Sequence, residues 1–493
     1  MEENTILLEE KEVYDSQNGK GFKKIFKNFS LLTIGKISGD FFTLILFVVL
    51  SREFGKEGIG EYSFAVGLTG LFAVCADFGL YSYTIKEISK DKSAFKNQFD
   101  KIISLRTAQS VVLFIVLLVV VVSLKFSVES KLIILMVGVF QIMYSSIDGI
   151  SAVFIAHEYM HISAAIEASF KISSSLIAII IALLGGGIVI SLTALPVIAI
   201  IMFFVARIIL RKKVGRSKLS FSYSYLRETF KHAMPYGISD FLWQLYARID
   251  IVLIGFILGE SAAGIYNVGY RVVFFLFFIA RFTSVALFPT VSKLYHESKH
   301  EFQKMYDKSL NMMIMICIPI SAGLWLIAPK LIELVFGSAF SESSIILRIL
   351  SGLFITTCLA SIMEVFLMAS DRQVRRAKRQ WTATWITIIL NAVLIYLYGI
   401  EGAAMAVLAC SLLLVVFYLY ELKWVIGLPD VASRLLISSL GVVAFCLPLS
   451  FLNLSIFLII PASVIIYIGV ILAFKDVRRT ELKMFLSLLA LSR

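Results

Sequence analysis

Apolar stretches of about twenty residues, separated by short polar breaks, occupy almost the whole chain. A helix of roughly 20 apolar residues crosses the hydrocarbon core of a bilayer and satisfies its own backbone hydrogen bonds there. The pattern therefore predicts an all-α polytopic membrane protein. We expect about fourteen transmembrane helices, near residues 28–50, 61–84, 102–124, 132–156, 163–184, 187–209, 232–257, 264–289, 309–328, 342–369, 380–398, 400–422, 432–451 and 454–474.

Composition supports a membrane protein and argues against other classes. Hydrophobic residues make up 59% of the chain and charged residues 16%, whereas a soluble protein carries roughly 25% charged residues. The five cysteines lie in apolar stretches and lack metal-binding spacing, so we interpret them as packing residues. We expect no metal and no cofactor other than a coupling ion, sodium or a proton.

The net charge of +12 is unevenly distributed among the loops. We assign 35 lysines and arginines, Arg106 among them, to the side that holds both chain ends, 5 to the opposite side and 6 to the spans. Because basic loops stay in the cytoplasm, this division predicts that both termini are cytoplasmic in a multi-pass protein of the cell membrane. Loop placement, rather than nucleic-acid binding, accounts for the positive charge.

Several positions recur along the chain at a constant offset. Gly55, Gly60 and Tyr62 recur as Gly259, Gly264 and Tyr266, each 204 residues later. A constant offset across a helix and its turn predicts an internal repeat of six helices, and transporters use such parallel repeats.

The repeat and the polar breaks together predict a domain plan. Acidic residues without an apolar face dominate the N-terminus, and the break in the middle of the chain is basic and then amphipathic, as at a membrane surface. The plan is a disordered cytoplasmic tail (1–21), an N-lobe of helices 1–6 (22–210), an amphipathic cytoplasmic linker (211–229), a C-lobe of helices 7–12 (230–422), and helices 13–14 with a cytoplasmic tail (423–493).

Charged side chains inside the expected spans are the candidate functional residues. Such a charge costs about 2.5–3.5 kcal/mol even on a lenient scale, so it normally faces a bundle interior or a cavity. The cations are Lys36, Lys171, Arg248, Arg271, Arg281 and Arg348, and the acids are Asp40, Asp77, Asp148, Glu167, Asp240, Asp250 and Glu364.

Some of these charges have structural interpretations. Lys36 with Asp40, and Glu167 with Lys171, have the i,i+4 spacing of helical ion pairs. Asp77 could serve only to anchor a helix end.

Arg271 and Arg281 differ, because no acid lies within i,i+4 of either residue on its own helix. Their partners must come from other helices or from a ligand. Because guanidinium groups bind phosphate in a bidentate manner, an anionic diphosphate is one candidate ligand.

The chain resembles the polysaccharide transporter, or oligosaccharide flippase, family of the multidrug/oligosaccharidyl-lipid/polysaccharide exporter superfamily. The likeness covers residues 22 to 475. The matching segments are SREFGKEGIGEYSFA after the first span, ADFGLYSYTIKEIS at the end of the second, RIDIVLIGFILGESAAGIYNVGYR across spans seven and eight, Phe288-Pro289, and LIELVFGSAF after span nine.

The resemblance implies two six-helix lobes around a central cavity, with two further C-terminal helices. It implies a flippase, not an enzyme, that moves a lipid-linked oligosaccharide to the outer leaflet. The expected partners are this substrate, membrane lipid, and a glycan polymerase or glycosyltransferases. In this interpretation Lys36, Arg248, Arg271, Arg281 and Arg348 contact substrate, and Asp40, Asp77, Asp240 and Asp250 serve ion coupling, Asp40 by analogy with other branches of the superfamily.

Two alternatives remain at this stage. A drug exporter of the same superfamily would share the fold, and the acids inside the spans suit a cationic substrate. A membrane glycosyltransferase or polymerase would need acids in a sizeable polar loop, and the outside loops near 125–131 and 329–341 are short and carry no acid pair.

Overall fold

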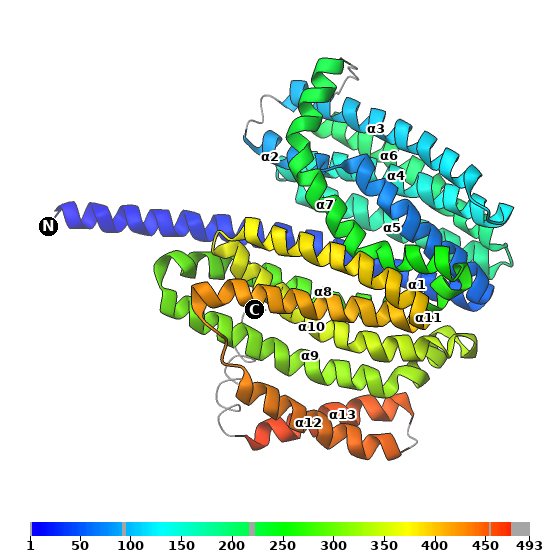
Figure 1. Ribbon diagram of the computed structural model, residues 1–493. Coiled ribbons are helices and arrows are strands. Elements are labelled where there is room, and N and C mark those ends of the chain that lie inside the picture. The colour runs from blue at the N-terminus through cyan, green and yellow to red at the C-terminus, as the bar shows by residue number, and fades with distance from the viewer. Residues whose placement is uncertain (1, 91–94, 216–221, 453–454, 475–493) are drawn as a thin grey trace. The chain divides into compact units, whose positions relative to one another are not determined.

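The computed structural model describes residues 2–90, 95–215, 222–452 and 455–474, and every regular element in these ranges is helical. An all-α architecture is thus confirmed (Figure 1). The elements are α1 (Glu2–Asp77), α2 (Leu80–Lys90), α3 (Phe95–Ser123), α4 (Val128–Ala156), α5 (Met160–Leu183), α6 (Ile188–Lys213), α7 (Tyr223–Ile257), α8 (Glu260–Glu297), α9 (Lys299–Phe336), the 3₁₀ turn η1 (Ser338–Phe340), α10 (Ser343–Ala369), α11 (Gln373–Ile426), α12 (Ala432–Phe451) and α13 (Ile456–Ala473).

Two of these helices contain a sharp internal break at a glycine. The backbone of α1 is left-handed at Gly55 (φ 63°), and that of α11 is left-handed at Gly399 (φ 60°). Glycine adopts this conformation without the Cβ clash that penalises other residues. Each helix therefore divides into two helical segments, in agreement with two expected spans in each.

Eleven helices of the described residues are long and apolar enough to cross a membrane by length and composition. A polytopic membrane protein is therefore supported, and the count of fourteen spans stays a prediction. The backbone of residues 2–21 is helical and continues into the rest of α1, and the cytoplasmic tail expected at 1–21 stays a prediction. The segment contains no proline, so nothing in it forces the helix to end.

By packing, the chain divides into two compact units. Unit 1 comprises residues 1–54 and 65–244, and unit 2 comprises residues 55–64 and 245–493. The lobe limits expected at 22, 210, 230 and 422 remain predictions. Of the expected linker 211–229, α6 covers the first residues and α7 the last, whereas 216–221 and the C-terminal tail 475–493 lie outside the described residues.

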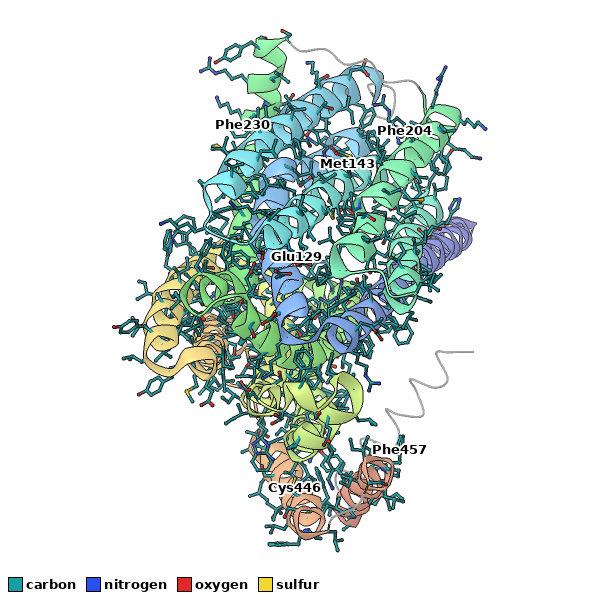
Figure 2. All side chains as sticks on the ribbon, turned by 90° about the vertical axis from the view of Figure 1, so that its right-hand side faces the viewer. Glu129, Met143, Phe204, Phe230, Cys446 and Phe457 are labelled. Atoms are coloured by element: carbon teal, nitrogen blue, oxygen red, sulfur yellow. The ribbon has the colours of Figure 1, made fainter. Side chains whose placement is uncertain are left out.

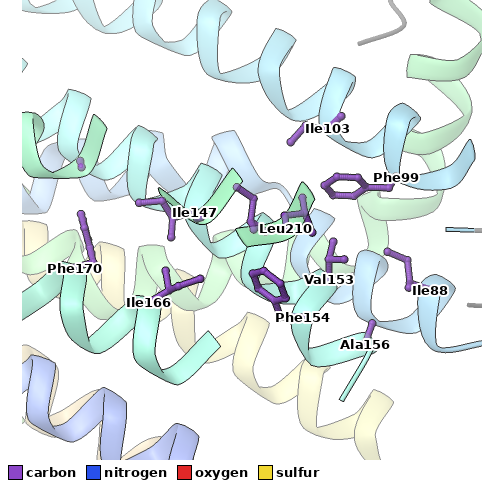
Figure 3. Packing of buried hydrophobic residues seen from close by; sticks show 13 residues of the cluster. Ile88, Phe99, Ile103, Ile147, Val153, Phe154, Ala156, Ile166, Phe170 and Leu210 are labelled. Carbon is purple, nitrogen blue, oxygen red and sulfur yellow. The ribbon is translucent and has the colours of Figure 1, made fainter. Parts of the chain in front are cut away.

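Unit 1 is built around α4, which packs against α2, α3, α5 and α6. Its apolar core includes Val153 and Phe154 of α4, and Figure 3 shows both near Leu210 of α6. Phe170 of α5 stacks on Phe140 and closes the other end of this core. The core fixes the face of α5 that carries the charged residues described below.

Unit 2 is built around α10, which packs against α8, α9 and α11. The pair α12 and α13 packs against α9, where Phe445 and Tyr467 are buried (Figure 2 labels Cys446 and Phe457 on this pair). Tyr467 donates a hydrogen bond of 2.8 Å to the carbonyl oxygen of Met315. This bond satisfies the one polar group of the buried tyrosine.

Candidate functional site

Charged side chains from α1 and α5 interlock in unit 1. The Lys171 ammonium lies 2.8 Å from Asp40 Oδ1 and 3.2 Å from Glu167 Oε1. Lys36 Nζ lies 3.7 Å from Glu167 Oε2. The Glu167–Lys171 pair predicted from the sequence is confirmed. Lys36 and Asp40 instead each pair with a residue of α5, so the four charges join two helices.

Tyr144 of α4 supports this group. Its hydroxyl donates a hydrogen bond of 3.1 Å to Glu167 Oε1, and its ring lies 5.7 Å from Lys171 Nζ. Phe170 stacks on the same ring. Met143, labelled in Figure 2, marks this part of α4. Glu167 is 5% exposed, so its charge is held by partners rather than by water.

A second ion pair in unit 1 joins Asp77 to Arg106. Arg106 of α3 is 1% exposed, and its guanidinium binds the Asp77 carboxylate and donates to the carbonyl oxygen of Ser145. Asp77 also accepts a hydrogen bond of 3.2 Å from the Tyr81 amide, so it holds the start of α2, as predicted. The guanidinium occupies the space beside Gly149, where a Cβ atom would overlap it.

The placement of Arg106 among the cytoplasmic loop cations is wrong, because this residue is buried within α3. Helix α3 begins at Phe95, so Arg106 lies three turns inside the helix. The side chain then points into the helix bundle, where a buried cation needs the acid that Asp77 supplies.

Asp148 of α4 lies within electrostatic range of residues from both groups, namely Glu167 and Lys36 of the first and Asp77 and Arg106 of the second. We define the unit 1 charge cluster as four acids and three cations: Lys36, Asp40, Asp77, Arg106, Asp148, Glu167 and Lys171. Asp240 of α7 is half-buried and lies within electrostatic range of Asp77.

Unit 2 contains a smaller group of charged residues. Asp250 is 4% exposed and accepts hydrogen bonds from the Tyr266 hydroxyl at 2.6 Å and the Ile251 amide at 2.8 Å. Arg248 lies within electrostatic range of Asp250, Arg271 and Tyr270. We define the unit 2 charge cluster as two cations and one acid: Arg248, Asp250 and Arg271.

Aromatic residues surround the unit 2 charge cluster. Tyr266 and Tyr270 stack at 6.1 Å between ring centroids, and Tyr270 and Phe274 stack at 5.9 Å. Tyr62 lies within electrostatic range of both Arg248 and Arg271. The rings of Tyr266, Tyr270 and Phe274 form one aromatic stripe along α8, and the Tyr266 hydroxyl bonds to Asp250 of the charge cluster. Arg248 and Arg271 also make other contacts within the chain, so both are held in place.

The other two predicted substrate contacts lie apart from this group. Arg348 of α10 donates a hydrogen bond of 3.3 Å to the carbonyl oxygen of Trp325 and lies 5.0 Å from the centroid of its ring. Arg281 of α8 is exposed and makes no ion pair or hydrogen bond with the described part of the chain. Within unit 2, the structure therefore brings Arg248 and Arg271 together and gives Arg281 and Arg348 different surroundings, whereas Lys36 belongs to the group of charges in unit 1.

A polar cavity that the sequence did not indicate lies between the ends of α2, α3 and α7 in unit 1. Its volume is about 460 Å³. The lining includes Tyr83 stacked on His232, with ring centroids 6.2 Å apart, and Lys101, which lies 3.8 Å from Glu228. Among the described residues, no group of three histidines, cysteines or acids is placed to hold a metal ion.

Comparison with known proteins places the chain among polysaccharide transporters. Residues 25–295 match the family described as "Polysaccharide biosynthesis protein", and residues 235–398 match the MatE family. The chain is 25% identical over 393 residues to the probable low-salt glycan biosynthesis flippase Agl15 of Haloferax volcanii, covering 76% of this chain and 78% of that protein. It is 25% identical over 387 residues to a putative O-antigen transporter of Shigella flexneri, covering 72% and 88%.

Among solved structures, the fold is similar to the lipid II flippase MurJ in an inward closed conformation. The TM-score is 0.76, with 15% identity over 92% of this chain and 99% of that chain. At this identity the likeness concerns the fold alone. The family matches, which cover more than half of the chain, show that it belongs to the polysaccharide biosynthesis protein family, within the multidrug/oligosaccharidyl-lipid/polysaccharide exporter superfamily.

Proposed function

We propose that the protein moves a lipid-linked oligosaccharide of the polyprenyl-diphosphate type from the cytoplasmic to the outer leaflet by alternating access. In this role it is a transporter without covalent chemistry, and it serves cell-surface polysaccharide or glycan biosynthesis. Family membership supports the polysaccharide pathway. The relatives are described as a flippase and an O-antigen transporter, in agreement with lipid-bound sugar as cargo.

The observation that carries the proposal is that Arg248 and Arg271 lie within electrostatic range of each other, beside the aromatic residues of α8. Both residues also have contacts within the chain, which hold their guanidinium groups in place. Like charges repel, so an anion that binds both guanidinium groups lowers their mutual repulsion. A diphosphate group has the charge and the oxygen geometry to do so.

The aromatic stripe beside the cluster supports the same ligand. Tyr270 lies next to Arg271 on α8 and stacks on Phe274, which is 45% exposed and so is accessible to an apolar chain or a sugar. The phosphate contact must weaken when the protein changes state, because a ligand with equal affinity for both states shifts no equilibrium.

Transport by purified protein in liposomes tests this function. A fluorescent polyprenyl-diphosphate oligosaccharide is added, and its movement is followed by the loss of accessibility to a membrane-impermeant reagent. We expect Arg271→Ala to slow transport by about tenfold or more, because a hydrogen-bonded charge contact is worth about 1.5–3 kcal/mol. Arg271→Lys should keep part of the rate, since it retains the charge but not the bidentate geometry.

Arg348→Ala is the matched control, because Arg348 is also a cation within an apolar helix but contacts Trp325. We expect it to retain most of the transport rate. Equal loss of transport in the Arg271 and Arg348 alanine variants, at equal protein abundance, would contradict a specific role for the unit 2 charge cluster.

A drug exporter is the second candidate, and the observation that favours it is the MatE match over residues 235–398. The four acids of the unit 1 charge cluster would suit a cationic cargo. Efflux of a cationic dye from intact cells distinguishes the two functions. Dye efflux that needs the protein, with no transport of the lipid-linked sugar, would favour the exporter.

We further propose that the unit 1 charge cluster takes up a coupling cation. Its four acids exceed its three cations by one, so one proton or sodium ion would balance the charge. Asp40 is the member predicted to respond, because 52% of its side chain is exposed.

The proposed orientation in the cell membrane has both termini in the cytoplasm, and the uneven distribution of basic loop residues supports it. Reporter fusions after Gly215 and after Gly259 test the orientation. We expect the first reporter to be cytoplasmic and the second to be outside. The reverse result would overturn the assignment of sides.

A further inference from the structure

One buried carboxylate in unit 2 organises three arginines. Glu421 lies in the second half of α11 and is 5% exposed. Arg379 donates to its Oε1 atom from Nε at 2.8 Å and lies 2.7 Å from it through Nη2. Arg375 Nη1 lies 3.5 Å and Arg372 Nη1 3.9 Å from its Oε2 atom. We call Arg372, Arg375, Arg379 and Glu421 the arginine cluster.

The arginine cluster carries more positive charge than its carboxylate neutralises. The nearby Arg376 does not share the Glu421 carboxylate, because it pairs with Glu364. The side chain of Arg375 is 58% exposed, and the neighbouring Lys378 is exposed and makes no ion pair with the described residues. Guanidinium donors are thus held in place, with hydrogen-bonding capacity to spare for a further anion.

Exposed aromatic side chains lie close in sequence to the arginine cluster, on both halves of α11. Trp381 and Trp385 lie one turn apart on the first half of α11, and Tyr420 and Trp424 lie on the second half. Their exposed fractions run from 45% to 65%. Tryptophan and tyrosine concentrate at the headgroup level of a bilayer, where the apolar ring and the polar tip both find their surroundings.

The two halves of α11 meet at this end of the hairpin. The Tyr418 hydroxyl donates a hydrogen bond of 3.4 Å to Gln380 Oε1, and the Arg379 guanidinium lies 5.4 Å from the ring centroids of Phe417 and Tyr420. The Arg379 guanidinium and the rings of Phe417 and Tyr420 therefore share one surface.

We propose that the arginine cluster binds the phosphate headgroup of an anionic phospholipid. The tryptophans place this surface at headgroup depth, and the guanidinium forks match a phosphate diester. The occupant is a membrane lipid because exposed aromatic residues lie on both halves of α11, close in sequence to the arginines and Glu421, as contact with acyl chains requires. This lipid is a bound ligand of the protein and not its cargo.

Quenching of tryptophan fluorescence by brominated lipids tests the proposal in nanodiscs. Trp243→Phe and Trp325→Phe are introduced into every variant, so that Trp381, Trp385 and Trp424 give the signal. Brominated phosphatidylglycerol and brominated phosphatidylcholine are compared at the same minor fraction in a phosphatidylcholine bilayer. We expect association of the anionic lipid to exceed that of the zwitterionic lipid by about fivefold, the effect of one basic residue near an anionic surface.

Substitutions then distinguish a specific binding site from a general attraction between the bilayer and the surface charge of the protein. The double variant Arg372→Gln/Arg375→Gln should lower the lipid preference to near one, and Arg372→Lys/Arg375→Lys should leave an intermediate preference. The matched control is Lys293→Gln/Lys304→Gln, which removes two exposed cations elsewhere in unit 2 that pair with acids on their own helices. It should keep the full preference.

Three results would overturn the proposal. They are equal quenching by the two lipids in the parent protein, no quenching by either lipid, and an equal loss of preference in the control and glutamine variants. Arg379 still holds Glu421 in the glutamine variant, so the hairpin should stay folded. Size-exclusion chromatography of each variant checks this.

Discussion

Gly60 and Gly264, which are 204 residues apart in sequence, lie backbone to backbone within unit 2. A Cβ atom on Gly264 would lie 2.9 Å from the Gly60 Cα atom and 2.8 Å from the carbonyl oxygen of Lys56. A Cβ atom on Gly60 would overlap the carbonyl oxygen of Glu260. The contact is reciprocal, because Lys56 and Glu260 are also separated by 204 residues.

The same offset joins Asn267 to Ser63. The Asn267 amide donates a hydrogen bond of 2.8 Å to the Ser63 hydroxyl across 204 residues of sequence. Contacts in which equivalent residues meet each other are the mark of a two-fold relationship. They support the internal repeat predicted from the sequence, at least for residues 55–64 and 259–268.

The glycine contact predicts that Gly60→Ala destabilises the protein by about 1–3 kcal/mol, because an added methyl group forces two backbones apart. Gly323→Ala is the matched control, since Gly323 lies within α9 and a Cβ atom there meets nothing within 4 Å. Thermal unfolding of the purified variants in detergent measures the difference. Equal melting temperatures for the two variants would show that the backbones at Gly60 and Gly264 can move apart without loss of stability.

The buried pair of Asp77 and Arg106 predicts a larger effect. Arg106→Ala leaves an uncompensated carboxylate and a carbonyl group without its donor, and we expect a loss of about 3–5 kcal/mol in stability. The double variant Asp77→Asn/Arg106→Gln should recover part of this loss, because no net charge is then left unpaired. Membrane abundance and melting temperature are the measurements.

Lys293→Ala provides the contrast to Arg106→Ala. Lys293 forms an ion pair of 3.6 Å with Glu297, but both side chains are more than half exposed. Such surface pairs contribute about 0–1 kcal/mol. An equally small loss of stability in Arg106→Ala and Lys293→Ala would contradict the prediction, because the Asp77 carboxylate would then have another partner or water in the variant.

The sequence could predict features that depend on short separations. The spacing of Glu167 and Lys171 gave their ion pair, and the position of Asp77 at the end of an apolar run gave its role at a helix end. The all-helical membrane architecture followed from apolar runs alone, because in lipid a spanning segment must pair its own backbone groups.

The sequence could not predict pairs that depend on packing between helices. Lys36 with Glu167, and Asp40 with Lys171, each join residues 131 positions apart. The pair of Arg379 and Glu421 is of the same kind, since the two residues are 42 positions apart on two halves of one hairpin. Glu421 lies inside the expected span 400–422 but was not among the acids named as candidates. Arg106 was counted with the cytoplasmic loop cations although it lies inside the expected span 102–124, and its helix begins still earlier, at Phe95.

The unit 1 charge cluster predicts the behaviour of Asp40→Asn. Lys171 already holds the Asp40 carboxylate at 2.8 Å, and the cluster retains one acid in excess. Removing one negative charge balances the cluster, so we expect transport that no longer responds to an imposed proton or sodium gradient. Rates in liposomes with and without each gradient measure this response.

Glu342→Gln is the matched control for Asp40→Asn. Glu342 also pairs with one lysine, Lys56, at 2.6 Å, but the pair is exposed and lies outside the charge clusters. It should keep the full gradient response of the parent protein. Unchanged gradient dependence in Asp40→Asn would remove Asp40 from ion coupling and leave its pair with Lys171 as a structural contact.

Arg281 provides the last prediction, because it differs from Arg271 in surroundings but not in chemistry. Ten residues of helix separate the two along α8, a rise of about 15 Å. Arg271 has partners within the chain, whereas Arg281 is exposed and forms no ion pair with the described residues. We therefore expect Arg281→Ala to lower transport at normal membrane abundance, and Arg281→Lys to retain part of the rate. Wild-type transport by Arg281→Ala would restrict phosphate contact to Arg248 and Arg271. Lower abundance, with abundance and transport restored in the charge-swapped double variants Arg281→Asp/Asp148→Arg or Arg281→Asp/Asp240→Arg, would instead mean that Arg281 serves as an ion-pair partner.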